Sequence, residues 1–586
     1  MKHLARLLPY LRRYWRAFAA GFACVFISNY FRARGPQYLQ RGIDALGPQG
    51  SAADVHRAIL LLLLVALASG VARYVMRETL NGASRRVETD LRDQLFGHFE
   101  RLSAEFYDRY PTGDLMARAT NDLLAVRMVA GPALMYLADT IVGATMMLPF
   151  MLSISPRLTG LALLPLVLLP VGMAVFGQAI HRRTLTIQAA YADLTSAVHE
   201  NLSGARIVRA YRQERAETDR FSTLNADYAR RNLALARVAG AFHPMLALLG
   251  GLGAVAVIWL GGRLVIQDTI STGKFVSFGV YLVMLVWPMI ALGWVVNLVQ
   301  RGAASMGRIV ELLDATPAIR SAERPVPLPP AATARALTFE HVWFRYPNAP
   351  ERGWVLQDVS FHLPAGGSLG VVGATGAGKS TLVELIVRAY DPDQGRILLD
   401  GVDLRDLQLT ELRRAIGHVP QETFLFSETL RNNVLLGAPD DGRLERVAAI
   451  SQLAPALPDL PNGFDTILGE RGVNLSGGQR QRAAIARALA QDPPVFVLDD
   501  ALSAVDAHTE MRILSGLRDA LARKTRVIVS HRLSAVRDCD AILVLDEGKV
   551  VEAGPHSTLM EKQGRYWELL RRQEVEEELE EAGSRD

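Results

Sequence analysis

"LGVVGATGAGKSTLVELI", residues Leu369 to Ile386, combines an apolar strand, a glycine-rich loop and the start of a helix. The loop follows the pattern G-x-x-x-x-G-K-[ST]. Its glycines allow backbone N–H groups to close around phosphate oxygens, and the following helix adds its positive end. In this pattern a lysine reaches the outer phosphates and a serine offers Mg2+ a hydroxyl. The stretch predicts an α/β domain that binds a nucleotide through Gly373, Thr375, Gly376, Gly378, Lys379, Ser380 and Thr381.

A second apolar strand lies downstream, in "PPVFVLDD" (Pro493 to Asp500), and its end is also a candidate part of the nucleotide site. Its apolar residues run directly into two carboxylates, which places Asp499 where it could hold the water shell of Mg2+. The alternative is a buried strand that ends in an acidic turn without a ligand.

A third feature is "LSGGQRQRAAIARALA", Leu475 to Ala490. Ser476, Gly477 and Gly478 begin a helix with exposed amides and a hydroxyl, which suits the binding of an anion. Taken alone, this stretch could equally be an ordinary glycine-rich helix start.

The first half of the chain has a different character, because 586 residues with 50% hydrophobic content are too apolar for an ordinary soluble enzyme. Six segments are each near the 20 residues that cross a bilayer. Arginines gather near the ends of these segments on one side, which the positive-inside rule makes the cytoplasm. The six predicted spans are residues 17–38, 57–78, 132–153, 158–180, 243–266 and 275–299.

Other features of composition exclude several classes of protein. Cys24 and Cys539 are far apart and belong to no Cys/His cluster, so neither a disulfide framework nor a zinc site is expected. The basic N-terminus precedes an apolar run without an A-x-A-like cleavage site, so we interpret it as an amphipathic elbow rather than a signal peptide. The charge of +4 comes from an arginine-rich chain, and we expect no nucleic-acid partner.

The spacing of the spans predicts the domain organisation. Polar, helix-rich segments of cytoplasmic sequence separate spans two and three, and spans four and five, with breaks at Pro111-Thr112-Gly113 and Ser203-Gly204. They are either helices that extend beyond the bilayer or solvated loops. We expect a transmembrane domain over 1–315, a Pro- and Ala-rich linker over 316–335, a nucleotide-binding domain over 336–572 and an acidic tail over 573–586.

These motifs occur in an order that resembles an ABC exporter half-transporter over nearly all of the chain. The resemblance implies a polytopic α-helical membrane domain of six transmembrane helices with long cytoplasmic extensions, fused to an α/β P-loop ATP-binding cassette, with ATP and Mg2+ as cofactors. In that family two cassettes close head to tail. The signature residues Ser476, Gly477, Gly478 and Gln479 would therefore act on the ATP of a partner.

The same resemblance assigns roles to further residues. Tyr346 would stack on adenine, Gln421 would sense Mg2+ and the membrane domain, and His531 would lie near the γ-phosphate. Asp506 would form the D-loop, and the loop that contains Glu470 would contact the coupling helices at the two polar breaks. Each of these residues could also have a purely structural role.

Asp500 departs from the family pattern, which usually has Glu after the Mg2+ aspartate. A side chain shorter by about 1.5 Å should be a poor general base, unless the loop moves forward. Together with the intact LSGGQ, it predicts a degenerate site and a partner half-transporter with an intact Walker B glutamate. Within the family, the chain resembles the B subunits of TmrAB-type multidrug and peptide exporters, which are similar to the transporter associated with antigen processing. A homodimeric exporter and an ATPase that regulates a channel are the alternatives.

The substrate is less clearly indicated. Arginines inside spans are costly in lipid, so they either line a central cavity, where they could meet anionic groups, or extend to the interface. Arg73 in the second span belongs with them. Drugs, lipids and peptides all remain possible cargo, and membrane lipid is expected around the spans. We expect a protein of the bacterial inner membrane. Its cassette and both termini would lie in the cytoplasm. The candidate cavity residues are Arg32, Arg34, Trp287, Trp294 and Asn297.

Overall fold

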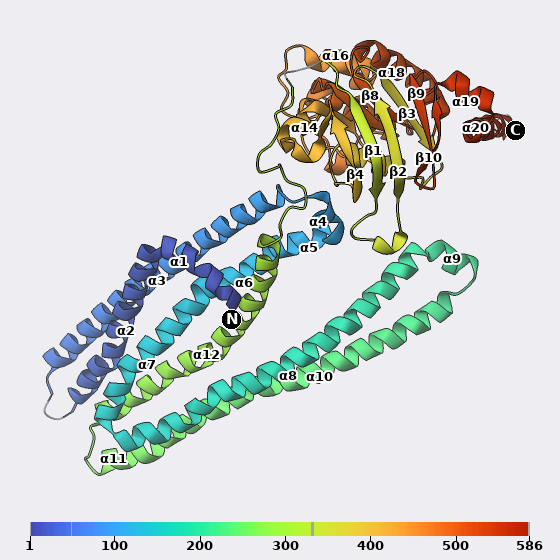
Figure 1. The fold of residues 1–586 in the computed structure, drawn as a ribbon. Helices are drawn as coiled ribbons and strands as arrows, with labels where there is room; N and C mark the ends of the chain where they lie inside the picture. The colour runs from blue at the N-terminus through green and yellow to red at the C-terminus, as the bar shows by residue number, and fades with distance from the viewer. Residues whose placement is uncertain (1, 48–49, 330–332, 584–586) are drawn as a thin grey trace. The chain divides into compact units, whose positions relative to one another are not determined.

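The computed structural model describes the whole chain except residues 1, 48–49, 330–332 and 584–586. The described chain separates into two compact units (Figure 1). Unit 1 comprises residues 1–100 and 112–315, and unit 2 comprises residues 101–111 and 316–586. The short segment 101–111 therefore belongs with the second half of the chain, although it lies between two long helices of the first.

Unit 1 is entirely helical. Its helices are long because apolar runs continue into polar, charge-rich sequence made mostly of helix-forming residues. Prolines inside them, such as Pro36 and Pro132, do not end the helices. Two π-helical turns, Arg118–Asp122 and Val129–Ala133, lie inside one continuous helix, and a third, Val257–Gly261, lies inside another. The α-helices are α1 (Leu8–Arg13), α2 (Trp15–Asp44), α3 (Ala52–Phe99), α5 (Thr112–Ala117), α6 (Leu123–Met128), α7 (Leu134–Ile154), α8 (Pro156–Ser203), α9 (Ala205–Ala210), α10 (Glu214–Ala256), α11 (Gly262–Ile266) and α12 (Thr272–Leu313).

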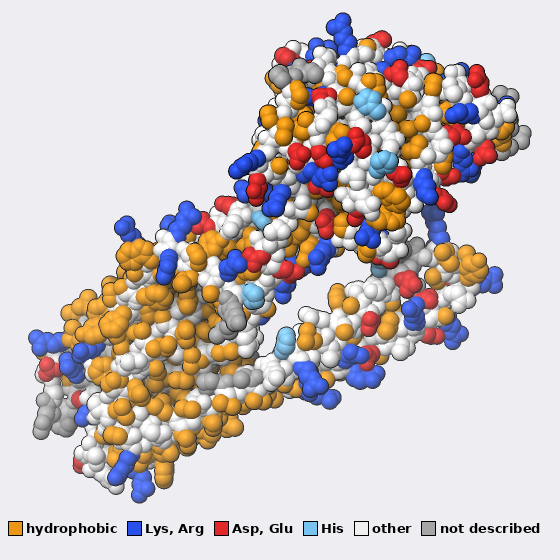
Figure 2. All heavy atoms as spheres, in the orientation of Figure 1, with side chains coloured by type: hydrophobic (Ala, Val, Ile, Leu, Met, Phe, Trp, Pro, Cys, Tyr) orange, Lys and Arg blue, Asp and Glu red, His pale blue; other side chains and the backbone are white. Residues whose placement is uncertain are grey.

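Five helical segments among the described residues are long and apolar enough to cross a membrane: 52–99, 112–154, 156–203, 214–266 and 272–313. The predicted first span lies in α2, a continuous helix of 30 residues. Its apolar sequence is interrupted by Arg32 and Arg34. The architecture is the predicted one, with α2 as the sixth long helix. Figure 2 shows hydrophobic side chains over the outer surface of these helices, as expected for lipid-facing segments.

The helices of unit 1 pack in two groups. Helices α2, α3, α7 and α12 form a bundle, in which the Tyr281 hydroxyl of α12 donates to the Ala33 carbonyl of α2 at 2.7 Å. Helices α8 and α10 run side by side over most of their length (Figure 1). The predicted break at Ser203-Gly204 is present, since α8 ends at Ser203 and the short helix α9 follows. At the other polar segment Pro111 lies between helices, but Thr112 and Gly113 already belong to α5.

Unit 2 contains two sheets. A four-stranded antiparallel sheet has the order β2-β1-β4-β5, and a six-stranded sheet has the order β10-β9-β3-β8-β7-β6, parallel except for β10. Because β3, β8 and β7 are adjacent and parallel, the loops after them meet at one edge of the sheet. The strands are β1 (Leu337–Phe344), β2 (Leu356–Leu363), β3 (Ser368–Gly373), β4 (Gln394–Leu399), β5 (Val402–Asp403), β6 (Ile416–Val419), β7 (Val495–Asp499), β8 (Thr525–Val529), β9 (Ala541–Asp546) and β10 (Lys549–Gly554).

The helices of unit 2 cover the parallel sheet and pack against its strands β6 and β7 in an apolar core. The linker residues also lie along this unit, since the Val326 N–H donates to the Asp406 carbonyl and Arg335 pairs with Asp400 at 2.7 Å. The acidic tail continues α20 as far as Gly583, and its last three residues lie outside the described residues. The helices are α4 (Ala104–Arg109), α13 (Lys379–Ile386), α14 (Leu409–Ala415), α15 (Leu430–Leu435), α16 (Arg443–Ile450), α17 (Gly477–Ala490), α18 (Ala507–Ala520), α19 (His556–Lys562) and α20 (Arg565–Gly583).

Candidate nucleotide-binding site

The phosphate loop connects the buried strand β3 to α13. Gly378, the residue before the helix, has φ +98°, and a Cβ there would lie 2.7 Å from a Leu356 side-chain carbon, so this position requires glycine. The Lys379 ammonium donates to the carbonyls of Gly373 and Ala374 at 2.8 and 3.0 Å. Burial lowers the pKa of Lys379, against the opposing attraction of the carboxylates of Asp500 and Asp499. The loop is thus wound around a cation, as a phosphate cradle requires.

Asp499 and Ser380 face each other across the loop. The Ser380 hydroxyl donates to an Asp499 carboxylate oxygen at 3.3 Å, and Asp499 is only 6% exposed. Burial raises the pKa of Asp499, with a further contribution from the charge of Asp500. Among the described residues no cluster of three His, Cys, Asp or Glu side chains is arranged to hold a metal. One carboxylate and one hydroxyl nevertheless fit Mg2+, which usually keeps several waters and phosphate ligands.

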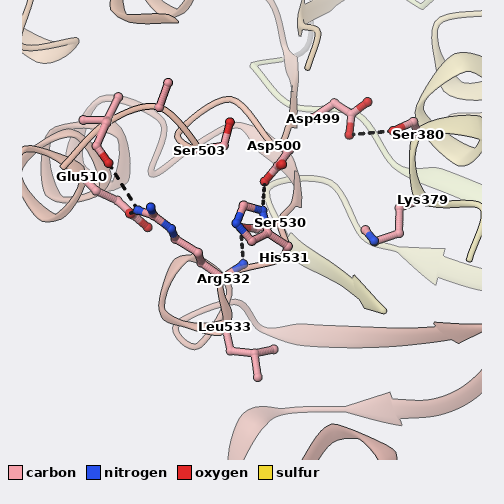
Figure 3. A network of polar contacts seen from close by, with 12 residues as sticks. Lys379, Ser380, Asp499, Asp500, Ser503, Glu510, Ser530, His531, Arg532 and Leu533 are labelled. Atoms are coloured by element: carbon pink, nitrogen blue, oxygen red, sulfur yellow. Dashed lines mark hydrogen bonds and ion pairs between the residues drawn. The ribbon is translucent and has the colours of Figure 1, made fainter. Parts of the chain in front are cut away.

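Asp500 is held in place by two contacts. Its N–H donates to the Val529 carbonyl at 2.9 Å, with φ +47°, and its carboxylate lies 2.7 Å from Nδ1 of His531 (Figure 3). The Asp500 side chain is 16% exposed and the His531 side chain 53% exposed. Strands β7 and β8 are neighbours, so the two residues meet at the same sheet edge as the phosphate loop. The predicted base position and the predicted switch histidine are therefore direct partners.

Gln481 links this edge to the glycine-rich helix α17, a link that no sequence motif indicates. Its side-chain amide donates to the Ser503 hydroxyl at 2.9 Å and accepts from the Ala504 N–H at 2.9 Å. The Ser503 N–H in turn donates to the Asp500 carbonyl at 3.3 Å. Only a pattern that placed Gln481 on the α17 face toward this loop would have revealed the link.

The start of α17 forms a reciprocal cap. The Ser476 hydroxyl accepts from the Gln479 N–H at 3.2 Å, and the Gln479 side chain accepts from the Ser476 N–H at 2.8 Å. These bonds leave the amides of Gly477 and Gly478 at the positive end of a 14-residue helix. Asp506 likewise caps α18, because its carboxylate accepts from the Thr509 N–H at 2.9 Å, and this bond lowers the Asp506 pKa.

Tyr346 follows β1 and lies over the phosphate-loop helix. Its hydroxyl donates to Glu384 at 2.7 Å and lies 2.9 Å from the Thr381 hydroxyl. Burial raises the pKa of Tyr346 and also that of Glu384. A cavity of about 430 Å³ borders the Tyr346 ring, which is half-buried. The structure thus places the predicted aromatic beside an open space, with Glu384 as a partner that the motif did not indicate.

Helix α4 contacts the same aromatic group within unit 2. The Tyr390 hydroxyl donates to Asp108, and the Tyr390 ring lies edge-on to Tyr346 with centroids 5.5 Å apart. The Asn348 side chain also donates to the Glu105 carbonyl at 3.0 Å. A segment that lies between two membrane helices in the sequence is therefore bonded directly to the neighbourhood of Tyr346.

The remaining predicted residues are exposed or belong to unit 1. Gln421 is exposed, two residues after the end of β6. In unit 1, Trp287, Trp294 and Asn297 are exposed on one side of α12. Arg32 and Arg34 are two residues apart on a helix, about 200° around its axis, so they face different surroundings.

Comparison with known proteins finds one family match in each half of the chain. Residues 18–289 match the family model described as the ABC transporter transmembrane region, and residues 356–503 match the one described as ABC transporter. A probable multidrug resistance ABC transporter of Bacillus subtilis, YheI, is 36% identical over 98% of this chain and 98% of its own.

Two other relatives differ in what their names say they carry. The multidrug resistance-like protein MdlA of Escherichia coli is 35% identical over 99% of this chain and 98% of its own. An ATP-dependent lipid A-core flippase of Syntrophus aciditrophicus is 33% identical over 99% of this chain and 96% of its own. A solved structure of a bacterial Atm1-family exporter with ATP bound superimposes with a TM-score of 0.78, at 27% identity, over 95% of this chain and 99% of that one.

Proposed function

The chain belongs to the ABC transporter family, as an exporter half with a transmembrane region fused to its cassette, and from this we propose that it works as the degenerate half of a heterodimer. As a member of this family it is a membrane-embedded exporter of the multidrug or lipid type that functions as a dimer and whose ATP hydrolysis drives export. The proposal adds that its own nucleotide site binds ATP but hydrolyses it poorly. Its signature would complete the competent site of a partner.

The observation that carries the proposal is the position of Asp500. A short side chain could act as a base if its loop moved toward the phosphates, but the Asp500 N–H is bonded to the sheet edge at Val529. Its carboxylate is also engaged by His531 at 2.7 Å. Since a displacement of about 1 Å can cost about 100-fold in rate, these two contacts favour a weak base.

The proposed ATP site assigns each group a task. The amides after Gly373 and the Lys379 ammonium would hold the phosphates, and the Tyr346 ring would stack on adenine. Ser380 and Asp499 would hold Mg2+, which neutralises phosphate charge when it is bound. In the partner's site, the free amides at the start of α17 would face the outer phosphate.

We also propose that α4 transmits the state of the cassette to the membrane helices. Its bonds to Tyr390 and Asn348 lie next to Tyr346, where nucleotide would bind. The second polar break, at α9, would dock on the cassette of the partner. Closure of the two cassettes would then move the membrane helices between inward-open and outward-open states, with the cassettes on the cytoplasmic side.

The test combines isolation with one substitution. The chain is purified from its native membrane in mild detergent, and the proteins that copurify in equal amount are identified by mass spectrometry. Asp500→Glu is then introduced into a transporter whose partner glutamate has been changed to Gln. We expect a second half-transporter with the glutamate, and a gain in ATP hydrolysis of about 100-fold from Asp500→Glu.

A homodimer would give a different result. In that case the chain would be recovered alone, would hydrolyse ATP at the rates of its relatives, and would be indifferent to Asp500→Glu. That combination would show that Asp500 is a functional base and would reject the proposal.

A further inference from the structure

A cavity of about 370 Å³ lies between α2, α3 and α12 in unit 1. Two arginines line it, Arg32 from α2 and Arg73 from α3. Apart from Ser69, the other side chains in its wall are apolar, with Leu39, Leu62 and Met284 the largest. The cavity therefore combines two cations with a surface suited to a hydrocarbon chain.

Neither arginine has a carboxylate partner among the described residues. The two guanidinium groups line the same cavity, so two like charges share one largely apolar space. Asp139, whose carboxylate accepts from the Asn29 amide at 2.7 Å, is not in ion-pair contact with Arg32. One terminal nitrogen of Arg73 is buried without a hydrogen-bond partner. Arginines in membrane helices are normally paired, so this pair lacks an anion.

A nearby arginine shows the ordinary arrangement. The Arg34 guanidinium lies 5.4 Å from the centre of the Tyr30 ring and 5.8 Å from that of Phe150. It also donates to the Gln37 side chain at 3.3 Å. Arg34 is thus satisfied by its own surroundings, whereas Arg32 and Arg73 face the cavity together.

We propose that this cavity binds an amphiphile with an anionic headgroup, a phosphate or a carboxylate, held between Arg32 and Arg73. Guanidinium groups bind such groups through paired, charge-assisted hydrogen bonds, and the apolar wall would hold the attached chain. The site is a property of the transmembrane unit and stands without the degenerate ATP site. It rests on the proposed function only if the amphiphile is cargo, since an anionic phospholipid of the bilayer has the same chemistry.

The first experiment measures binding to the full chain with its copurifying partner in a neutral detergent. Dodecyl phosphate is titrated by calorimetry, with inorganic phosphate and dodecanol as separate probes. We expect Arg32→Gln and Arg73→Gln each to weaken dodecyl phosphate binding about 10-fold, with partial recovery in the Lys variants. Arg57→Gln removes an exposed charge from the same helix as Arg73 and should leave binding unchanged.

Three outcomes would overturn the assignment. Unchanged binding in both Gln variants would remove the arginines from the site. Equally tight binding of inorganic phosphate would show that the apolar wall contributes nothing. If the assembled wild-type transporter does not bind dodecyl phosphate, the cavity is not a site for an anionic amphiphile.

A second arm separates lipid from cargo. Transporter is reconstituted in phosphatidylcholine bilayers with and without phosphatidylglycerol, and retained lipid is identified by native mass spectrometry. A bilayer ligand predicts retention of phosphatidylglycerol that Arg32→Gln abolishes. Cargo predicts that dodecyl phosphate stimulates ATP hydrolysis and is moved across the vesicle membrane. A transporter that binds dodecyl phosphate but moves no solute would contradict the proposed function and leave the binding site intact.

Discussion

Tyr346 is held by neighbouring residues at its hydroxyl and at its ring. Its hydroxyl bonds to Glu384 on the phosphate-loop helix, and its ring lies against Phe344 and Tyr390 with centroids 5.1 and 5.5 Å away. A ring that is already ordered loses little rotamer entropy on stacking, so most of the stacking energy contributes to affinity. The family motif predicts the aromatic residue at this position, but only the structure identifies what orients it.

We expect Tyr346→Ala to weaken ATP labelling of this chain about 10- to 100-fold, because stacking on a base is worth about 1–3 kcal/mol. Tyr346→Phe keeps the ring and should retain most of the labelling. Photocrosslinking with an azido-ATP, followed by separation of the two subunits, reports this site alone. Equal losses in both variants would mean that the hydroxyl, and not the ring, contacts the nucleotide.

His418 gives a prediction about pH. It lies on β6, its Nε2 is buried without a hydrogen-bond partner among the described residues, and burial lowers its pKa to about 4 from 6.5. Between these values the unfolded chain binds a proton that the folded chain does not, so the stabilising contribution of neutral His418 is lost as pH falls from 6.5 toward 4. At 1.36 kcal/mol per pH unit, the loss is at most about 3 kcal/mol.

The measurement is thermal unfolding of the full chain from pH 7.5 down to pH 5. We expect His418→Leu to flatten the fall in melting temperature below pH 6.5. The control is His508→Leu, because His508 is exposed on α18. Parallel curves for wild type and His418→Leu would show that this histidine takes up its proton without cost to the fold.

At the scale of elements, the sequence predicted well wherever a local pattern sufficed. The strand, loop and helix around Lys379 form because β-branched residues, glycines and a helix-forming run follow one another. Contacts between distant segments could not be predicted in this way. Nothing local indicates that α4 bonds to Tyr390, that Gln481 holds the loop after Asp500, or that Arg73 and not Arg34 shares a cavity with Arg32.

The bond between α4 and the cassette leads to a prediction about coupling. Asp108→Ala and Tyr390→Phe each remove the same partly buried, charge-assisted hydrogen bond. We expect either change to lower the amount of solute moved per ATP hydrolysed about 3- to 10-fold, with ATP labelling preserved. The double variant should lose no more than either single variant, because both changes remove one interaction.

Proteoliposomes that report transport and hydrolysis together provide the measurement. Asp93→Ala, on the exposed side of α3, is the matched control for loss of a carboxylate. Additive losses in the double variant would show that Asp108 and Tyr390 act through separate contacts, and unchanged coupling would show that α4 does not transmit the state of the cassette.

For the whole molecule, the sequence predicts the division of the chain because hydrophobic runs and nucleotide motifs occupy different halves. It also predicts an asymmetric dimer from one missing methylene at Asp500. Contacts within one chain cannot establish this asymmetry, because each ATP site of the family is made by two chains. The consequence can be tested with substitutions in this chain alone, since its own ATP uses its phosphate loop and the partner's ATP uses its signature.

Lys379→Ala removes the cation that the loop is wound around, whereas Ser476→Arg places a bulky charge at the amides that start α17. If this chain is the degenerate half, Lys379→Ala should only partly reduce ATP hydrolysis by the assembled transporter. Ser476→Arg should lower ATP hydrolysis about 100-fold or more, because this substitution damages the competent site, which uses the partner's phosphate loop. Ser476→Thr keeps the capping hydroxyl and should remain active, which separates the signature from helix stability. Steady-state hydrolysis of the purified dimer measures all three variants. In a homodimer each of these substitutions would alter both ATP sites, so Lys379→Ala and Ser476→Arg would be equally inactive. Unequal losses of ATP hydrolysis in the two variants are therefore what an asymmetric transporter requires.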